Sequence, residues 1–231
     1  MRFLCLHGSG TNAEILEIQT GGLRQQLEKK GHRFIFVNGR QDAQVESGMS
    51  LVPRSQAILT QEVVPELEGI FDGPFYNHYP RGPTPGAGVL EAFEHTYRII
   101  SEQGPFDAVM GFSQGAALAA ALIIHHAKEN PHAPPLFRAA VFLCGGCPFD
   151  RSGMAYITPQ PDTYTISIPT AHIVGKLDPL YPESMKLYGL CEPSQAVIYD
   201  HGSKHMVPFD VKNTDGMTRA IEETVARAMS I

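Results

Sequence analysis

Six short, continuous runs of apolar residues constrain the fold of this chain more than any other feature. They are rich in β-branched and aromatic residues and cover 2–6, 33–37, 108–110, 139–143, 171–174 and 196–199. Continuous rather than alternating runs are typical of parallel strands that are buried on both faces. Helix-like stretches lie between them at 13–30, 89–102, 114–128, 183–188 and 211–229. This alternation predicts a single α/β domain with a mostly parallel sheet of about six strands flanked by helices.

The composition and charge of the chain argue against several classes of protein. Its 231 residues, 43% of them hydrophobic and 18% charged, are enough to bury a sizeable core. A formal net charge of −6, with Lys and Arg scattered along the chain, argues against a nucleic-acid partner. No apolar stretch reaches the roughly 18 residues of a membrane span. Because the first strand pattern begins at Arg2, we expect no secretory signal and a cytoplasmic protein.

Two irregular segments interrupt the pattern and are candidates for the walls of a substrate pocket. The first, 39–88, contains six prolines and an aromatic cluster, and we interpret it as a lid-like insertion between the second and third strands. The alternative is that its aromatic side chains only cover a surface loop. The second segment spans 148–169. We expect the pocket to be lined by His7, Phe75, Tyr76, His78, Tyr79, Phe149, Leu180 and Met206.

The strongest local motif is the GxSxG sequence from Gly111 to Gly115, with Ser113 at its centre. It follows a predicted strand and precedes a helix of small residues, which is the context of a nucleophile elbow. The two glycines would let the strand and the helix cross closely around a strained serine. A serine that only caps the helix is the alternative, since Ser is a favoured N-cap residue.

A serine nucleophile needs a histidine base and a carboxylate that orients the histidine, and in this context acid and base follow in that order. Asp178 comes after the fifth predicted strand and is the expected acid, with Asp162 and Asp200 as competitors. His205 lies late in the loop after the last strand and is the expected base. His201, directly after that strand, is the alternative.

The loop after the first strand matches an HGxG pattern from His7 to Gly10. Such a loop supplies a backbone amide to an oxyanion hole, and we expect the N–H groups of Ser9 and Gln114 to be the two donors. His7 is expected to support the loop. The alternative, a phosphate-binding glycine loop, lacks both the GxGxxG spacing and the P-loop lysine.

The four cysteines are predicted to be reduced, because they are few and three of them adjoin apolar residues. Cys144 and Cys147 have CxxC spacing, but no second pair or histidine cluster completes a zinc site. We therefore predict neither a metal nor a redox role for this pair.

Taken together, these segments resemble the fungal serine hydrolase (FSH) family of the α/β-hydrolase superfamily over nearly the whole chain. The resemblance depends on FLCLHGSGTNAEI, GPFYNHYP, FDAVMGFSQGAALAA, IPTAHIVGKLDPL and KHMVP. It implies the α/β-hydrolase fold, a triad of Ser113, Asp178 and His205, oxyanion donors at Ser9 and Gln114, and no cofactor. Members of the family include esterases and thioesterases that release polyketides.

We expect a serine hydrolase that cleaves an ester or thioester of an apolar acyl group through an acyl-enzyme. A thioesterase acting in trans in fungal polyketide biosynthesis, with transient contact to an acyl carrier domain, is one form of this expectation. The alternatives are a carboxylesterase of general metabolism, an acyltransferase or cyclase, and a non-catalytic binding module on the same fold. The sequence predicts no metal, no membrane partner and no particular oligomeric state.

Overall fold

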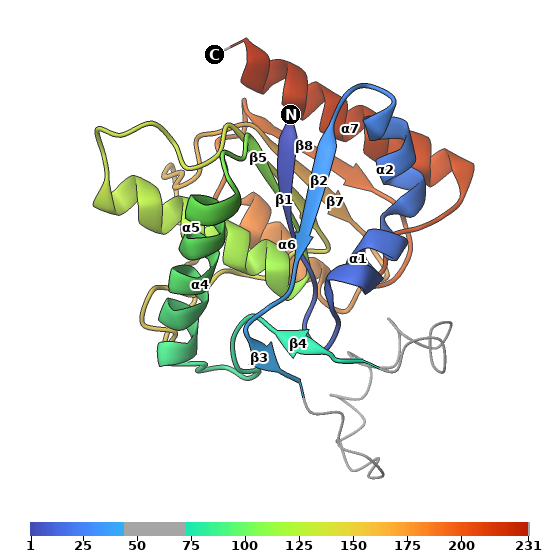
Figure 1. Ribbon diagram of the computed structural model, residues 1–231. Coiled ribbons are helices and arrows are strands. Elements are labelled where there is room, and N and C mark those ends of the chain that lie inside the picture. The colour runs from blue at the N-terminus through green and yellow to red at the C-terminus, as the bar shows by residue number, and fades with distance from the viewer. Residues whose placement is uncertain (44–72, 231) are drawn as a thin grey trace.

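The computed structural model describes residues 1–43 and 73–230, and a six-stranded sheet runs through its centre (Figure 1). The strand order is β2-β1-β5-β6-β7-β8, and every neighbouring pair is parallel. The predicted strands are confirmed, some longer by one or two residues. Their bounds are β1 (Arg2–Leu6), β2 (Arg33–Val37), β5 (Ala108–Phe112), β6 (Ala139–Leu143), β7 (Thr170–Val174) and β8 (Ala196–Asp200).

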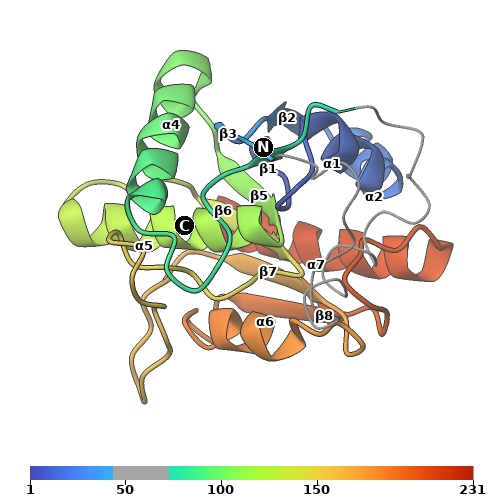
Figure 2. The same cartoon turned by 90° about the horizontal axis from the view of Figure 1, so that it is seen from below.

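Helices cover both faces of this sheet (Figures 1 and 2). One face carries α4 (Ala87–Gln103), α5 (Gln114–Glu129) and α6 (Tyr181–Tyr188). The other carries α1 (Ala13–Gln19), α2 (Gly21–Glu28) and α7 (Val211–Met229). Two layers of helices around a parallel sheet explain why the central strands β1, β5, β6 and β7 are almost completely buried. The edge strands β2 and β8 are partly exposed.

The strand residues alternate between two hydrophobic clusters. In β1, Leu4 and Leu6 join the cluster under α4 and α5, whereas Phe3 and Cys5 join the cluster under α1, α2 and α7. All four side chains are at most 1% exposed. Because successive strand side chains point to opposite faces, the continuous apolar run fills both clusters.

The predicted helix 13–30 is wrong as one element, because the chain breaks it at Thr20 into α1 and α2. The Thr20 hydroxyl donates to the Leu16 carbonyl at 2.7 Å, and Gly21 and Gly22 follow directly. Glycine is a poor helix former, so two in succession allow the axis to turn. Asn12 begins α1 by accepting the Ile15 N–H at 2.8 Å.

Only the two ends of the predicted lid insertion 39–88 fall within the described residues. Its central part, 44–72, lies outside them and includes Phe71, one residue of the aromatic cluster in this segment. The described ends form a short antiparallel pair that the sequence did not predict, β3 (Gln41–Asp42) with β4 (Tyr76–Asn77). Tyr76 also bridges to Thr11. This pair therefore packs beside the loop that follows β1.

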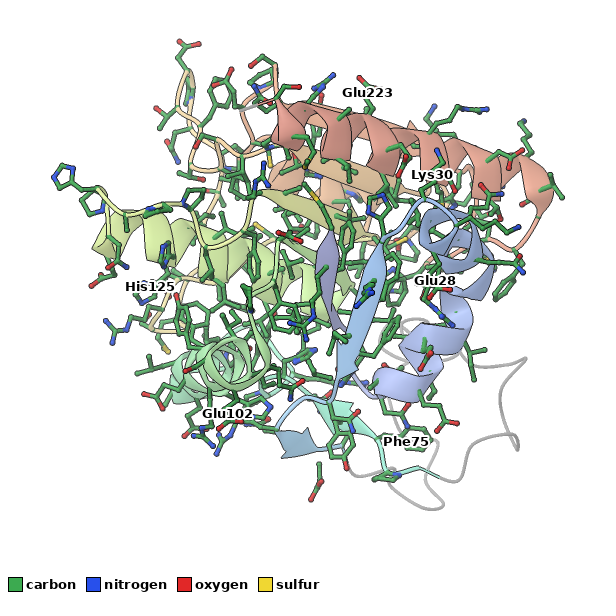
Figure 3. All side chains as sticks on the ribbon, turned by 45° about the horizontal axis from the view of Figure 1, so that its top comes forward. Glu28, Lys30, Phe75, Glu102, His125 and Glu223 are labelled. Carbon is green, nitrogen blue, oxygen red and sulfur yellow. The ribbon has the colours of Figure 1, made fainter. Side chains whose placement is uncertain are left out.

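Several charged side chains on and around α2 and α7 are exposed, among them Glu28, Lys30 and Glu223, which Figure 3 labels. Among residues 1–43 and 73–230, no helix combines the length and apolarity that crossing a membrane requires.

Candidate active site

Ser113 stands at a sharp turn between β5 and α5 with a backbone conformation that side chains rarely adopt. Its φ is 52° and its ψ is −114°. The turn is held from both sides: the Ser113 N–H donates to the Leu143 carbonyl at 2.9 Å, and the Ser113 carbonyl accepts the N–H groups of Ala116 and Ala117 at 3.1 Å. A strained residue that its surroundings hold this firmly is typical of a functional site.

The two glycines of the GxSxG motif are required by close backbone approach. A Cβ on Gly115 would collide with the Leu6 carbonyl oxygen, and one on Gly111 would lie 2.5 Å from the Ala116 nitrogen. Real Cβ atoms do not approach backbone so closely. The motif therefore lets α5 begin directly against the end of β1.

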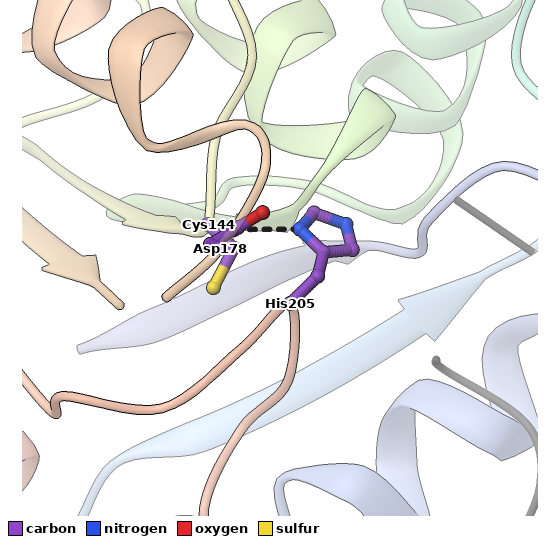
Figure 4. A group of neighbouring side chains, drawn as sticks. All are labelled: Cys144, Asp178 and His205. Atoms are coloured by element: carbon purple, nitrogen blue, oxygen red, sulfur yellow. Dashed lines mark hydrogen bonds and ion pairs between the residues drawn. The ribbon is translucent and has the colours of Figure 1, made fainter. Parts of the chain in front are cut away.

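Asp178 and His205 meet at the carboxyl edge of the sheet, after β7 and β8 (Figure 4). His205 Nδ1 lies 2.7 Å from Asp178 Oδ2, and both side chains are buried. The second carboxylate oxygen of Asp178 accepts the Leu180 N–H at 2.7 Å. An ionised carboxylate only accepts, so the histidine Nδ1 carries the proton in this bond and Nε2 is left with a lone pair.

His205 also lies against the serine turn. Its ring contacts that of Phe112, the residue before Ser113, with the centroids 5.0 Å apart. The competing residues are engaged elsewhere. His201 Nδ1 accepts the Ser203 N–H at 3.1 Å, and Asp200 accepts the backbone N–H groups of Lys176 and Gly202. Asp162 is exposed. These contacts favour Asp178 and His205 over the alternatives.

The loop after β1 reaches the same turn. A Cβ on Gly8 would lie 3.5 Å from Ser113 Cβ and 2.9 Å from the Phe112 ring, so Gly8 leaves room for the serine. Within the described part of the chain, neither the Ser9 N–H nor the Gln114 N–H has an assigned acceptor. Two N–H groups beside one serine, one of them at the first residue of a helix, are suited to stabilise a negative oxygen.

Two buried histidines hold the loop after β1 in place through hydrogen bonds to its backbone. His7 Nδ1 donates to the Gly8 carbonyl at 2.6 Å, while its Nε2 accepts the Gly39 N–H at 2.9 Å. His78 Nε2 donates to the His7 carbonyl at 3.0 Å, and the two rings stack with centroids 4.6 Å apart. Burial lowers the pKa of His7 to about 4 and lowers that of His78 as well. Both rings are thus neutral near pH 7, as this bonding pattern requires.

Gln114 joins the support through its side chain. Its Oε1 accepts the His78 N–H at 2.8 Å, and its Nε2 donates to the Tyr79 carbonyl at 3.0 Å. Asn77 Oδ1 accepts both the Ser9 hydroxyl at 2.6 Å and the Gly10 N–H at 2.8 Å. Sequence reasoning missed Asn77 as a supporting residue. Its only signal was its place in the aromatic GPFYNHYP segment.

The predicted pocket residues divide into two groups. His7, His78, Tyr79 and Phe149 are at most 6% exposed and pack in the interior, Tyr79 edge-on against Phe149. Phe75, Tyr76, Leu180 and Met206 are half-buried. His7 and His78 bond to the loop beside the serine turn, through the Gly8 and His7 carbonyls. The Leu180 N–H donates to Asp178, and the Met206 carbonyl accepts from the Cys144 thiol beside the Asp178–His205 pair. Their role in lining a pocket stays a prediction.

Cys144 is the other chemically active side chain beside this pair. Its sulfur and the side-chain ligand atoms of Asp178 and His205 all lie within 4.8 Å of one another, so among described residues these three could hold a metal ion (Figure 4). Burial and the nearby Asp178 carboxylate raise the pKa of the Cys144 thiol. Metal binding requires the thiolate, which this environment disfavours. Cys147 donates to the Ile157 carbonyl instead, so the CxxC cysteines have separate partners.

Known proteins resemble this chain in sequence and in structure. The family model "Serine hydrolase (FSH1)" matches residues 1–217. Esterase FPY3 of Fusarium mangiferae is 36% identical, with 99% of both chains covered. Hydrolase phiM of Talaromyces stipitatus is 28% identical over 96% of this chain and 87% of its own.

Among solved structures, a carboxylesterase from Mesorhizobium loti superposes with a TM-score of 0.60 at 17% identity, covering 96% of this chain and 88% of its own. A monoacylglycerol lipase from Paleococcus ferrophilus superposes with a TM-score of 0.57 at 16% identity, covering 98% and 94%. At such low identity these two matches concern the fold alone. They show that the chain has the α/β-hydrolase fold. The family model and the likeness to esterase FPY3 show that the chain belongs to the FSH1 family of serine hydrolases.

Proposed function

We propose that this chain hydrolyses a carboxylic ester or thioester, with Ser113 as nucleophile, His205 as general base and Asp178 as the residue that orients His205. The observation that carries the proposal is the 2.7 Å bond from His205 Nδ1 to Asp178, made by a ring that packs beside the strained serine turn. That bond leaves Nε2 of the neutral ring as the proton acceptor a serine hydroxyl needs.

In the reaction, Ser113 Oγ attacks the acyl carbonyl while His205 Nε2 takes the hydroxyl proton. The negative charge that develops on the carbonyl oxygen is stabilised by the N–H groups of Ser9 and Gln114. His205 then protonates the departing alcohol or thiol, which leaves Ser113 acylated. A water molecule, deprotonated by His205, attacks the acyl group and releases the acid and the free serine.

Labelling with a fluorophosphonate probe tests this assignment, because the probe reacts with activated serines. Labelling of the native chain that is lost in Ser113→Ala and His205→Ala supports the proposal. Ser152→Ala and His126→Ala are matched controls on the surface, and both should label like the native chain. Full esterase activity in Ser113→Ala would refute the proposal, since removing the nucleophile should lower kcat at least about a thousandfold.

Within this reaction class we propose an apolar acyl group carried as a thioester, with a transient acyl-carrier partner from polyketide biosynthesis. Two observations support it: aromatic side chains lie at 75–79 and 149, and the relatives include a fungal esterase, FPY3, and a fungal hydrolase, phiM. Acyl-pantetheine thioesters and ethyl esters of the same acids separate this proposal from a general carboxylesterase. A higher kcat/KM for the ethyl esters would favour the carboxylesterase.

A further inference from the structure

An arginine lies against the loop proposed to form the oxyanion hole. Arg81 Nε donates to Ser9 Oγ at 2.6 Å. A Cβ on Gly10 would collide with Arg81 Nη2, so the guanidinium packs directly on the Ser9–Gly10 turn. Arg81 is itself exposed and thus open to a ligand. Its charged group therefore contacts the residue whose backbone N–H is the proposed oxyanion donor.

The guanidinium is held in place through only one of its nitrogens. Ser9 Oγ accepts from Arg81 and donates to Asn77 Oδ1 at 2.6 Å, and Asn77 Oδ1 also accepts the Gly10 N–H. Pro80, whose ring packs on Gly88, precedes the arginine. Nε is thus engaged, while within residues 1–43 and 73–230 no acceptor is assigned to Nη1 or Nη2. These two nitrogens form the fork that binds a carboxylate.

Among the carboxylates of residues 1–43 and 73–230, none pairs with Arg81, although acidic residues are plentiful in the sequence. The sequence has 24 acidic and 18 basic residues. Other arginines form ion pairs with glutamates. Arg24 pairs with Glu17 and Glu28, Arg40 with Glu91, and Arg227 with Glu223. Among described residues, Arg81 has no such partner. A fixed cation without a counter-ion beside a reaction centre is suited to an anionic group of the substrate.

We propose that Arg81 binds a carboxylate that the substrate carries close to its scissile carbonyl. The proposal rests on the ester or thioester hydrolysis proposed above, but not on a wholly apolar acyl group. It assigns instead, as the substrate class, monoesters or monothioesters of dicarboxylic acids, or esters of short hydroxy acids. The guanidinium contacts Ser9 itself, whose N–H is proposed to bind the carbonyl oxygen. Only a few bonds therefore separate the carboxylate from the reacting carbon.

The test compares charged and neutral esters of equal length. On the acyl side, the 4-methylumbelliferyl monoester of adipic acid is compared with the hexanoate. On the alcohol side, 4-carboxyphenyl hexanoate is compared with phenyl hexanoate. The variants are Arg81→Gln, which removes the charge, and Arg81→Lys, which keeps it without the planar fork. Arg98→Gln, an exposed arginine on α4, is the matched control.

We expect Arg81→Gln to lower kcat/KM for one charged ester about tenfold to a hundredfold, while its neutral partner changes less than threefold. Arg81→Lys should recover part of the loss, and Arg98→Gln should change neither ester. The pair of esters in which kcat/KM for the charged member depends on Arg81 shows whether the carboxylate is on the acyl or the alcohol side. Equal losses for charged and neutral esters would overturn the proposal, because Arg81 would then only hold the Ser9 loop.

Two further outcomes also overturn it, and they separate this inference from the proposed function. If the native chain hydrolyses the neutral esters and no charged ester depends on Arg81, the inference fails and the hydrolase proposal stands. If the native chain hydrolyses none of the four esters and is not labelled at Ser113, both proposals fail together.

Discussion

At the residue scale, the Asp178–His205 bond decides which nitrogen of the imidazole carries the proton. Asn at position 178 keeps the size of the side chain but can offer a donor to Nδ1, which favours the opposite tautomer and removes the base from Ser113. We expect Asp178→Asn to lower kcat about a thousandfold or more. Asp200→Asn is the control, because among the described residues Asp200 accepts the backbone N–H groups of Lys176 and Gly202 and pairs with the Lys176 side chain. Similar kcat values for both variants would refute the role of Asp178.

Also at this scale, the buried neutral His7 makes stability depend on pH. Its pKa falls from 6.5 to about 4 on folding, so the unfolded chain binds more protons between these values. The stabilisation is complete above pH 6.5 and is lost as the pH falls toward 4. Lowering the pH from 7 to 5 should therefore cost about 2 kcal/mol through His7.

Urea unfolding at pH 7 and pH 5 measures this effect. In His7→Gln, which has no titrating ring, the loss between the two pH values should be smaller than in the native chain by that amount. His126→Gln, at the exposed end of α5, serves as the control and should retain the native pH dependence. An unchanged pH dependence in His7→Gln would show that the ring is not held neutral.

At the scale of elements, the contact between the end of β1 and the start of α5 fixes the distance between the Ser9 loop and Ser113. Gly115→Ala would place a methyl group against the Leu6 carbonyl oxygen, which cannot move without breaking β1 from its neighbours. We expect a destabilisation of about 2–4 kcal/mol in urea unfolding. Gly146→Ala is the control, because its methyl group would meet only Ala117 Cβ at 4.0 Å. A loss of unfolding free energy below about 1 kcal/mol in Gly115→Ala would mean that β1 and α5 can move apart enough to accept the methyl group.

Elements and proposed catalytic residues differed in how far the sequence predicted them. The six strands were predictable because each contains a continuous run of mostly apolar residues, which the four central strands bury on both faces and the edge strands β2 and β8 bury in part. Ser113, Asp178 and His205 followed from their places after strands, since parallel strands bring their carboxyl ends to one edge. The short β3–β4 pair and the Asn77 contacts were not predictable, because they depend on partners 34 to 68 residues away and two-residue strands have no periodic signal.

At the scale of the whole molecule, the core between α7 and the sheet is distinct from the carboxyl edge of the sheet, where the proposed catalytic residues lie. Met217 on α7 is fully buried against the sheet, in the cluster opposite α4 and α5. Met217→Ala should cost about 2–5 kcal/mol of unfolding free energy through the cavity it leaves. Met229, on the same helix and 62% exposed, is the matched control and should cost almost nothing as Met229→Ala.

The same two variants test whether the packing of α7 on the sheet affects catalysis. Well below the unfolding temperature, both should keep kcat/KM for an ester within about twofold of the native value, because α7 contacts the strands while the proposed catalytic groups lie in loops at their carboxyl ends. A large fall in kcat/KM in Met217→Ala, without unfolding by circular dichroism, would mean that the position of the His205 loop depends on how α7 packs. The loop runs directly into α7, so that result would place the hinge of the site between Met206 and Asp210.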